Sequence, residues 1–351
     1  MRLIRPRPPS PAADARLVYR WDLDKTYLKS EFDTLRELVR IPFEKAEDKI
    51  AAPGAAALMH GLRESALSRG RSVRVYFLSA SPPQIGRAIR RKLELDGIVY
   101  DGIVFKNQLQ RIMRGKLRHL REQVGYKLTE LLKSRSTELP NAREYLFGDD
   151  WESDPLTYSL YADVVEGTLP VAALEPLLLR IGVDPMLVPA LRGLGAAVAG
   201  LAGVERIFIN LERRTAPAFF GRFGSRLVPT FNYFQTALVL AADGWLDAED
   251  VAAVAAGLVE RSGYTPRRLE NSLADLVRRG LVPVHGSHAL TAPMRAADLL
   301  PALPRRAWLV RLRARLGRRK PPVVRRALEG PLDYDEILAR VRPAVQEVRA
   351  R

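Results

Sequence analysis

Two aspartates separated by one residue follow a short strand-like run near the start of the chain. Asp22 and Asp24 flank Leu23 at the end of the run 17–21. Because alternate residues of an extended segment point to the same side, both carboxylates can face one crevice. One could then attack a phosphoryl group while the other moves a proton. Alone, such a pair is more typical of a turn or a helix cap, so its chemistry depends on its neighbours.

Polar groups that could act with this pair follow at three later points: Ser79, Lys127 and the acidic segment 148–154. Ser79 and Asp149 each come directly after a strand-like run. A divalent cation offsets the charge of carboxylates around a phosphoryl group, and Mg²⁺ prefers oxygen ligands. Asp22 and Asp149 could supply those ligands, while Ser79 and Lys127 could hold phosphate oxygens.

Strand-like runs alternate with helical patterns in this part of the chain, which predicts an α/β fold with a parallel sheet. The expected strands are 17–21, 73–78, 98–105, 144–147 and 162–165. Helical patterns cover 31–70, where prolines interrupt them, then 84–95 and about 127–133. Ligands bind at the carboxyl ends of the strands in such sheets, so Asp22, Ser79 and Asp149 should converge.

The order of these motifs resembles that of the haloacid dehalogenase (HAD) superfamily. DLDKT at 22–26 resembles the first motif, DxDxT; Ser79 resembles the second, Lys127 the third, and the segment 148–154 the acidic fourth. Within that superfamily, FLSASPPQI, GYKLTELL and YLFGDDWESDPLTYSLYADVV look most like the catalytic domain of actin-patch-associated phosphatidate phosphatases. The resemblance covers about residues 17–168 and implies a Rossmann-like parallel sheet with flanking helices.

The resemblance also implies a role for each motif residue in a magnesium-dependent phosphatase. Asp22 would be the nucleophile, Asp24 the general acid and base, and Thr26 a hydrogen-bonding brace for their loop. Ser79 would bind the transferring phosphoryl group, and Lys127 would neutralise it. The implied metal-binding residues are Asp22, Asp24 through its carbonyl, Asp149, and Asp154 as the residue that orients the others.

Two residues depart from the family pattern, and one role has competitors. Arg20 lies in a first strand that is usually apolar, and Lys25 follows the acid-base aspartate. Lys106 and Lys116 compete with Lys127 for the third motif because the spacing between the second and third motifs varies.

Composition favours anionic partners and excludes several kinds of chemistry. The 351 residues include 56 Lys and Arg against 40 Asp and Glu, a net charge of +16. Such a charge attracts nucleic acid, anionic lipid or phosphorylated substrates. The chain has no cysteine, which excludes disulfides, thiolate catalysis and cysteine-ligated zinc. A Walker-type glycine loop is missing, which argues against a P-loop kinase.

The opening segment 1–14 is basic and proline-rich, and we interpret it as a flexible leader without a secretion signal. No apolar run is long enough to span a bilayer. We therefore expect a cytoplasmic protein, with peripheral contact to an anionic membrane as a further option.

A change of composition near residue 170 predicts two units: a HAD-like phosphatase domain at 15–168 and a mainly helical C-terminal region at 169–351. In the second unit, two amphipathic helices at 246–261 and 266–279 precede a hairpin-like run at 281–293, with Thr265 as an N-cap.

This helix-helix-hairpin order predicts a winged-helix-like module at 244–293, which could bind nucleic acid. Further on, the basic amphipathic pattern at 305–320 could lie on an anionic membrane or pack on its own domain.

The sequence thus predicts a magnesium-dependent phosphomonoester hydrolase that works through an aspartyl-phosphate. Phosphatidate is the preferred substrate, and another anionic phosphorylated compound, small molecule or lipid, is open. The alternative is a nucleic-acid-binding or regulatory protein whose HAD-like domain senses phosphate, or a phosphatase of nucleic-acid ends.

Overall fold

The computed structural model describes residues 16–24, 26–28, 51–79, 83–105, 116–138, 140–151, 153–201, 203–302 and 332–347. The leader predicted at 1–14, Lys25, Lys106 and the basic pattern at 305–320 lie outside the described residues.

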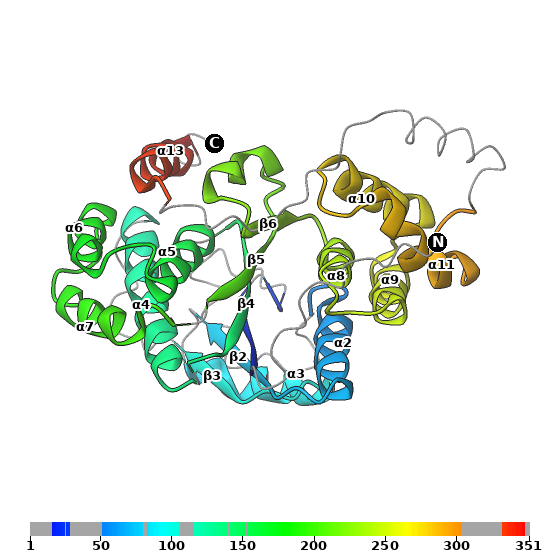
Figure 1. Ribbon diagram of the computed structural model, residues 1–351, viewed down its shortest axis with the longest axis horizontal. Coiled ribbons are helices and arrows are strands. Elements are labelled where there is room, and N and C mark those ends of the chain that lie inside the picture. The colour runs from blue at the N-terminus through cyan, green and yellow to red at the C-terminus, as the bar shows by residue number, and fades with distance from the viewer. Residues whose placement is uncertain are drawn as a thin grey trace, which may run out of the picture.

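Six strands of the described chain form one parallel sheet in the order β3-β2-β1-β4-β5-β6 (Figure 1). Their bounds are β1 Leu17–Asp22, β2 Val73–Ser79, β3 Gly102–Phe105, β4 Arg143–Asp149, β5 Val204–Asn210 and β6 Leu227–Thr230. Every neighbouring pair is parallel. The strand order reverses between β1 and β4, which is where doubly wound sheets bind ligands.

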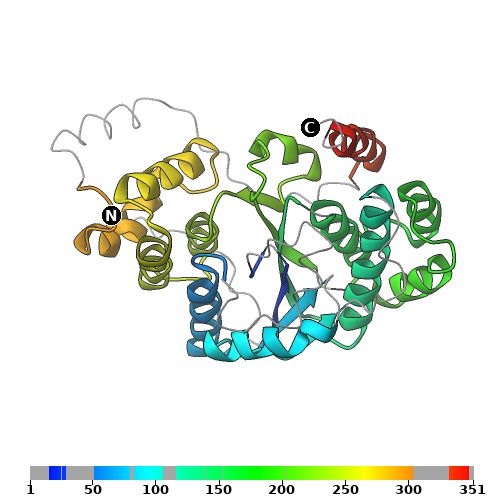
Figure 2. The same ribbon diagram turned by 180° about the vertical axis from the view of Figure 1, so that it is seen from behind.

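Helices cover both faces of the sheet (Figures 1 and 2). One face carries α4 Lys116–Ser136, α5 Asp154–Glu166, α6 Val171–Ile181 and α7 Val188–Val198, with the short helix η4 Pro217–Phe223 and α13 Tyr334–Glu347. The other face carries η3 Pro83–Ile85, α2 Ala55–Ser68, α3 Gly86–Leu95, α8 Tyr233–Ala242, α9 Ala248–Ser262, α10 Pro266–Arg278 and α11 Val284–Ala296. The predicted α/β class, a parallel sheet with flanking helices, is confirmed.

The central strands are buried on both faces, as parallel sheets require. Leu17, Tyr19 and Trp21 of β1 pack on the α2 and α8 side. Trp21 stacks on Phe147 of β4, with ring centroids 3.9 Å apart. These contacts fix the sheet beneath the strand ends that carry the candidate site.

Arg20, the unexpected charge in the first strand, lies in a buried polar network on the α4 side of the sheet. It is 3% exposed. Its guanidinium donates to Glu144 at 2.8 Å and to Ser134 at 2.7 Å. Tyr161 also donates to Glu144, and burial and the charge of Glu144 raise the pKa of this phenol well above its usual value. Arg135 lies 3.9 Å from the same carboxylate. Glu144 therefore offsets two buried cations.

We predict that Glu144→Gln destabilises the fold more than Arg20→Met does. The first change removes the carboxylate that both buried guanidinium groups contact, and breaking a buried ion pair costs about 3–5 kcal/mol. The second leaves Glu144 with Arg135 and Tyr161. Urea unfolding of both variants measures the difference, and equal losses of stability would contradict this account of the network.

The prediction of a strand at 162–165 was wrong, because these residues lie inside α5. Pro155 in the first turn and Gly167 in the left-handed conformation, with φ 73°, define the ends of the helix. Almost all of α5 is buried, so the helix has no polar face. Its sequence therefore lacks the alternation of polar and apolar residues, with a period of 3.6, that indicates a surface helix. A short β-branched run in such a helix is indistinguishable from a buried strand.

The sheet extends past residue 168, where few further strands were expected. β5 and β6 follow α7 in the chain and continue the sheet from β4, with Asp149 beside Asn210. The rest of the described C-terminal region is mainly helical.

The hairpin predicted at 281–293 was also wrong, because α11 occupies most of this segment. The two preceding helices are confirmed as α9 and α10, and Thr265 caps α10 by accepting from the Arg268 amide at 3.3 Å. Met294 of α11 is buried in the same core as α8 and α9, so packing decides this segment's structure. None of the described helices is both long enough and apolar enough to cross a bilayer.

Candidate active site

Three predicted site residues are the last residues of three adjacent strands. Asp22 ends β1, Ser79 ends β2 and Asp149 ends β4. Because β2 and β4 flank β1 in parallel, the three side chains lie at the same edge of the sheet. All three are fully buried.

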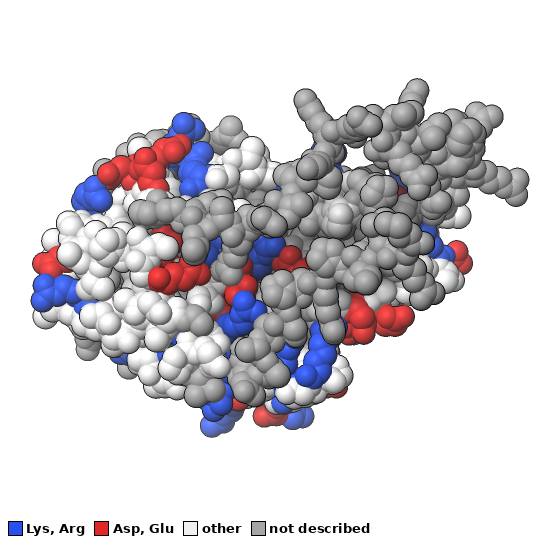
Figure 3. All heavy atoms as spheres, viewed as in Figure 1, with Lys and Arg blue, Asp and Glu red and all other residues white. Residues whose placement is uncertain are grey.

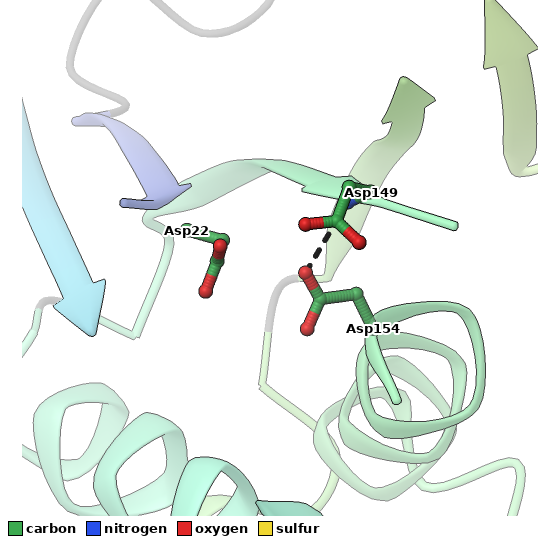
Figure 4. Close-up of side chains that lie close together, drawn as sticks. All are labelled: Asp22, Asp149 and Asp154. Carbon is green, nitrogen blue, oxygen red and sulfur yellow. Dashed lines mark hydrogen bonds between the residues drawn. The ribbon is translucent and has the colours of Figure 1, made fainter. Parts of the chain in front are cut away.

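Asp154 completes a carboxylate cluster with Asp22 and Asp149 (Figure 4). One oxygen from each of the three lies within 4.8 Å of the others. Asp154 is the first residue of α5, where the helix dipole favours a negative charge. Its Oδ2 also accepts from the Asp149 amide at 3.3 Å, so the strand end positions the helix start.

Lys127 of α4 binds two members of this cluster. Its Nζ donates to Asp22 Oδ1 at 2.8 Å and to Asp154 Oδ1 at 2.5 Å, and the side chain is fully buried. Lys106 and the side chain of Lys116, the other two candidates for the third motif, lie outside the described residues. The assignment of this motif to Lys127 therefore stays a prediction, which its contacts with Asp22 and Asp154 support.

The remaining two predicted residues join the same network. Ser79 Oγ donates to Asp24 Oδ2 at 2.8 Å, which links the first and second motifs. Thr26 Oγ1 donates to Asp149 Oδ2 at 3.5 Å, the long limit of a hydrogen bond. The structure thus brings all seven predicted side chains together, and their catalytic roles stay predictions.

Three further residues that shape this site had no individual role in the sequence analysis. Tyr233 of α8 donates to the Thr26 carbonyl at 2.6 Å and so ties the first loop to a helix far along the chain. Asp150 accepts from main-chain amides in the loop after β5. At Gly148 a Cβ atom would lie 2.4 Å from Asp154 Oδ2. Gly148 and Asp150 lie within the predicted acidic segment 148–154, whereas Tyr233 had no visible signal in the sequence.

We predict that Gly148→Ala displaces Asp154 and destabilises the protein by about 1–3 kcal/mol, as expected for overpacking. Gly221→Ala is the matched control, because a Cβ atom there has no neighbour within 4 Å. Thermal unfolding of the two variants tests this, and equal melting temperatures would contradict it.

The charges of the site fit a bound divalent cation. Among the described residues, the site has four buried carboxylates, those of Asp22, Asp24, Asp149 and Asp154, and the buried Lys127 contacts two of them. A surplus of buried negative charge is unfavourable unless a cation offsets it. Carboxylate oxygens are also the ligands that hard divalent cations prefer.

Comparison with protein families gives an independent finding. Residues 21–170 match the model of the family described as phosphatidate phosphatase APP1, catalytic domain. This match supports an APP1-like phosphatase. It includes every residue of the candidate site predicted from the sequence and ends before β5. Comparisons with curated proteins and with solved structures found no match.

Proposed function

We propose that this chain is a magnesium-dependent phosphatase of the HAD type that hydrolyses phosphate monoesters through a phosphorylated aspartate. The observation that carries the proposal is the cluster of Asp22, Asp149 and Asp154, whose ligand oxygens lie within 4.8 Å of one another beside Lys127. The APP1-like match over residues 21–170 supports a phosphatase. The substrate is phosphatidate or another anionic phosphorylated compound.

In the first step, the Asp22 carboxylate attacks phosphorus, and the bond from phosphorus to the leaving oxygen breaks. Asp24 donates a proton to that oxygen, so the alcohol leaves neutral. In the second step, water attacks the phosphorylated Asp22 and gives its proton to Asp24. Inorganic phosphate leaves, and both carboxyl groups return to their starting states.

The other side chains hold these reactants in position. Ser79 donates to Asp24, and we propose that a phosphoryl oxygen shares this hydroxyl when substrate binds. Lys127 supplies positive charge between Asp22 and Asp154. Asp22, the Asp24 carbonyl and Asp149 would hold Mg²⁺, with Asp154 orienting them. When bound, the ion offsets the charge that gathers around the phosphoryl group.

The alternative of a nucleic-acid-binding protein gains no support from the described residues. The expected wing is a helix. On the face drawn in Figure 3, the described basic and acidic side chains are interspersed, and no continuous basic stripe of the kind that tracks a nucleic acid is visible there.

Asp22→Asn should reduce turnover at least about a thousandfold while the fold persists, because an amide cannot act as the nucleophile. Release of inorganic phosphate from phosphatidate in mixed micelles and from a panel of soluble monoesters, with Mg²⁺ present, measures this. Asp335→Asn on the surface of α13 is the control and should keep full activity. Unchanged turnover in folded Asp22→Asn would eliminate Asp22 as nucleophile.

Mg²⁺ should raise the melting temperature of the wild-type protein, because a ligand that binds only the folded state stabilises it by about 2.7 kcal/mol at a hundred times its Kd. Asp149→Asn should lose most of this shift, and a chelator should abolish both the shift and turnover. An equal Mg²⁺ shift in wild type and variant would exclude Asp149 as a ligand.

A further inference from the structure

A cavity of about 710 Å³ opens beside the candidate active site, at the carboxyl ends of β5 and β6. Asn210, the last residue of β5, lines it and pairs with Asp149 in the register between β4 and β5. Neighbouring strands lie about 4.8 Å apart, so the cavity begins one strand away from the carboxylate cluster. Tyr233 also lines it and contacts the Thr26 carbonyl.

Most polar groups in the cavity wall already bind one another. Asn210 donates to Glu212 at 2.6 Å, and Asn232 donates to Ser272 at 3.0 Å. Asp275 accepts from Gln235 at 3.1 Å and forms ion pairs with Arg278 and Arg279 at the end of α10. These hydrogen bonds fix the shape of the wall.

Two arginines that line the cavity, unlike Asp275, have no ion-pair partner among the described residues. Within the described part of the chain, neither Arg214 nor Arg268 has a carboxylate partner for its guanidinium. Arg268 lies over the Tyr264 ring, 4.2 Å from its centroid, which orients the guanidinium and leaves its N–H edge available. Both side chains are exposed to solvent, and two arginines without a carboxylate partner on the lining of one cavity can donate to an anionic ligand.

The backbone of Arg214 is held in an unfavourable conformation. Its φ is 57°, in the left-handed region that an arginine rarely adopts. The amides on either side of it, those of Arg213 and Thr215, donate to the Asp150 carboxylate at 2.9 and 3.2 Å. Asp150 directly follows Asp149, so one acidic segment shapes both the carboxylate cluster and the loop that carries Arg214. Such strain is typical of binding sites.

The size and lining of the cavity indicate what enters it. Its volume is in the range of small-molecule sites and exceeds what one phosphate fills. The wall mixes amide, hydroxyl and charged side chains with apolar ones, and polar atoms make up the larger part of its surface, so it suits a polar group better than acyl chains. The apolar lining residues are Ala52, Pro53, Leu211, Phe231 and Leu258.

We propose that this cavity binds the leaving group of the substrate, and that Arg214 and Arg268 bind a second anionic group on it, a phosphate or a carboxylate. This inference rests on the proposed function for the reacting phosphate. It narrows the substrates to phosphate monoesters whose leaving group carries a second anion, which favours another anionic phosphorylated compound over phosphatidate, whose leaving group is uncharged.

The test compares alkanediol bisphosphates of three to six carbons with the corresponding alkyl monophosphates, in the full chain with Mg²⁺. A bisphosphate has two scissile groups, which alone would double its kcat/KM. Beyond this factor of two, the wild type should show a kcat/KM for the best bisphosphate at least about tenfold above that of the corresponding monophosphate, because charge-assisted hydrogen bonds are strong. Arg214→Gly and Arg268→Gln should each remove most of this preference, mainly through KM, and leave monophosphate turnover within twofold of wild type.

Glycine is chosen at position 214 because it adopts the left-handed conformation without strain, so the loop is preserved. Arg213→Gln and Arg267→Gln are the controls, since these neighbours do not line the cavity, and both should keep the preference. A preference that survives both cavity variants, or no preference in the wild type, would overturn the inference.

Calorimetric binding of the bisphosphate separates the two proposals. If no ester is hydrolysed but binding weakens about tenfold in both cavity variants, the phosphatase proposal fails and the cavity assignment stands. If hydrolysis occurs but binding is the same in all variants, the phosphatase stands and the cavity assignment fails.

Discussion

The structure depends on one constraint: several carboxylates of like charge are buried together, away from solvent. Asp22, Asp149 and Asp154 lie together at the end of the sheet, and Lys127 binds two of them while fully buried. Water cannot screen such a cluster, so its geometry must be imposed by the surrounding fold. In the function that we propose, the same buried negative charge would favour the binding of a cation.

The parallel sheet determines where these side chains lie. Three adjacent parallel strands end in Asp22, Ser79 and Asp149, and the aromatic contact between Trp21 and Phe147 fixes β1 against β4. On the opposite side, Glu144 offsets two buried arginines below the same strands. Gly148 lets the start of α5 approach β4 closely enough for Asp154 to reach the cluster. Each contact uses a different element, so the site tolerates little movement of any one.

The second half of the chain completes the surroundings of the site. The family match ends at residue 170, yet β5 and β6 continue the same sheet, and Tyr233 of α8 binds the loop that follows β1. Asp150 connects the acidic motif to the loop after β5. The cavity at the carboxyl ends of β5 and β6 is thus lined mainly by residues that lie beyond the family match.

The sequence alone determined the features that short-range chemistry encodes. Strands that stop at a polar residue predicted β1, β2 and β4 and the convergence of Asp22, Ser79 and Asp149, while Thr265 before Pro266 predicted the start of α10. Caps and strand ends are decided within a few residues, so they can be recognised in one dimension.

Only the tertiary structure decided the rest. Burial on all sides made 162–165 part of a helix, and packing against α8 and α9 made 281–293 mostly helical as well. The partner of Arg20 lies 124 positions away in Glu144, and the contact between Tyr233 and Thr26 spans 207. Such pairings depend on how distant segments meet in the folded chain, because no local pattern specifies which buried groups become neighbours.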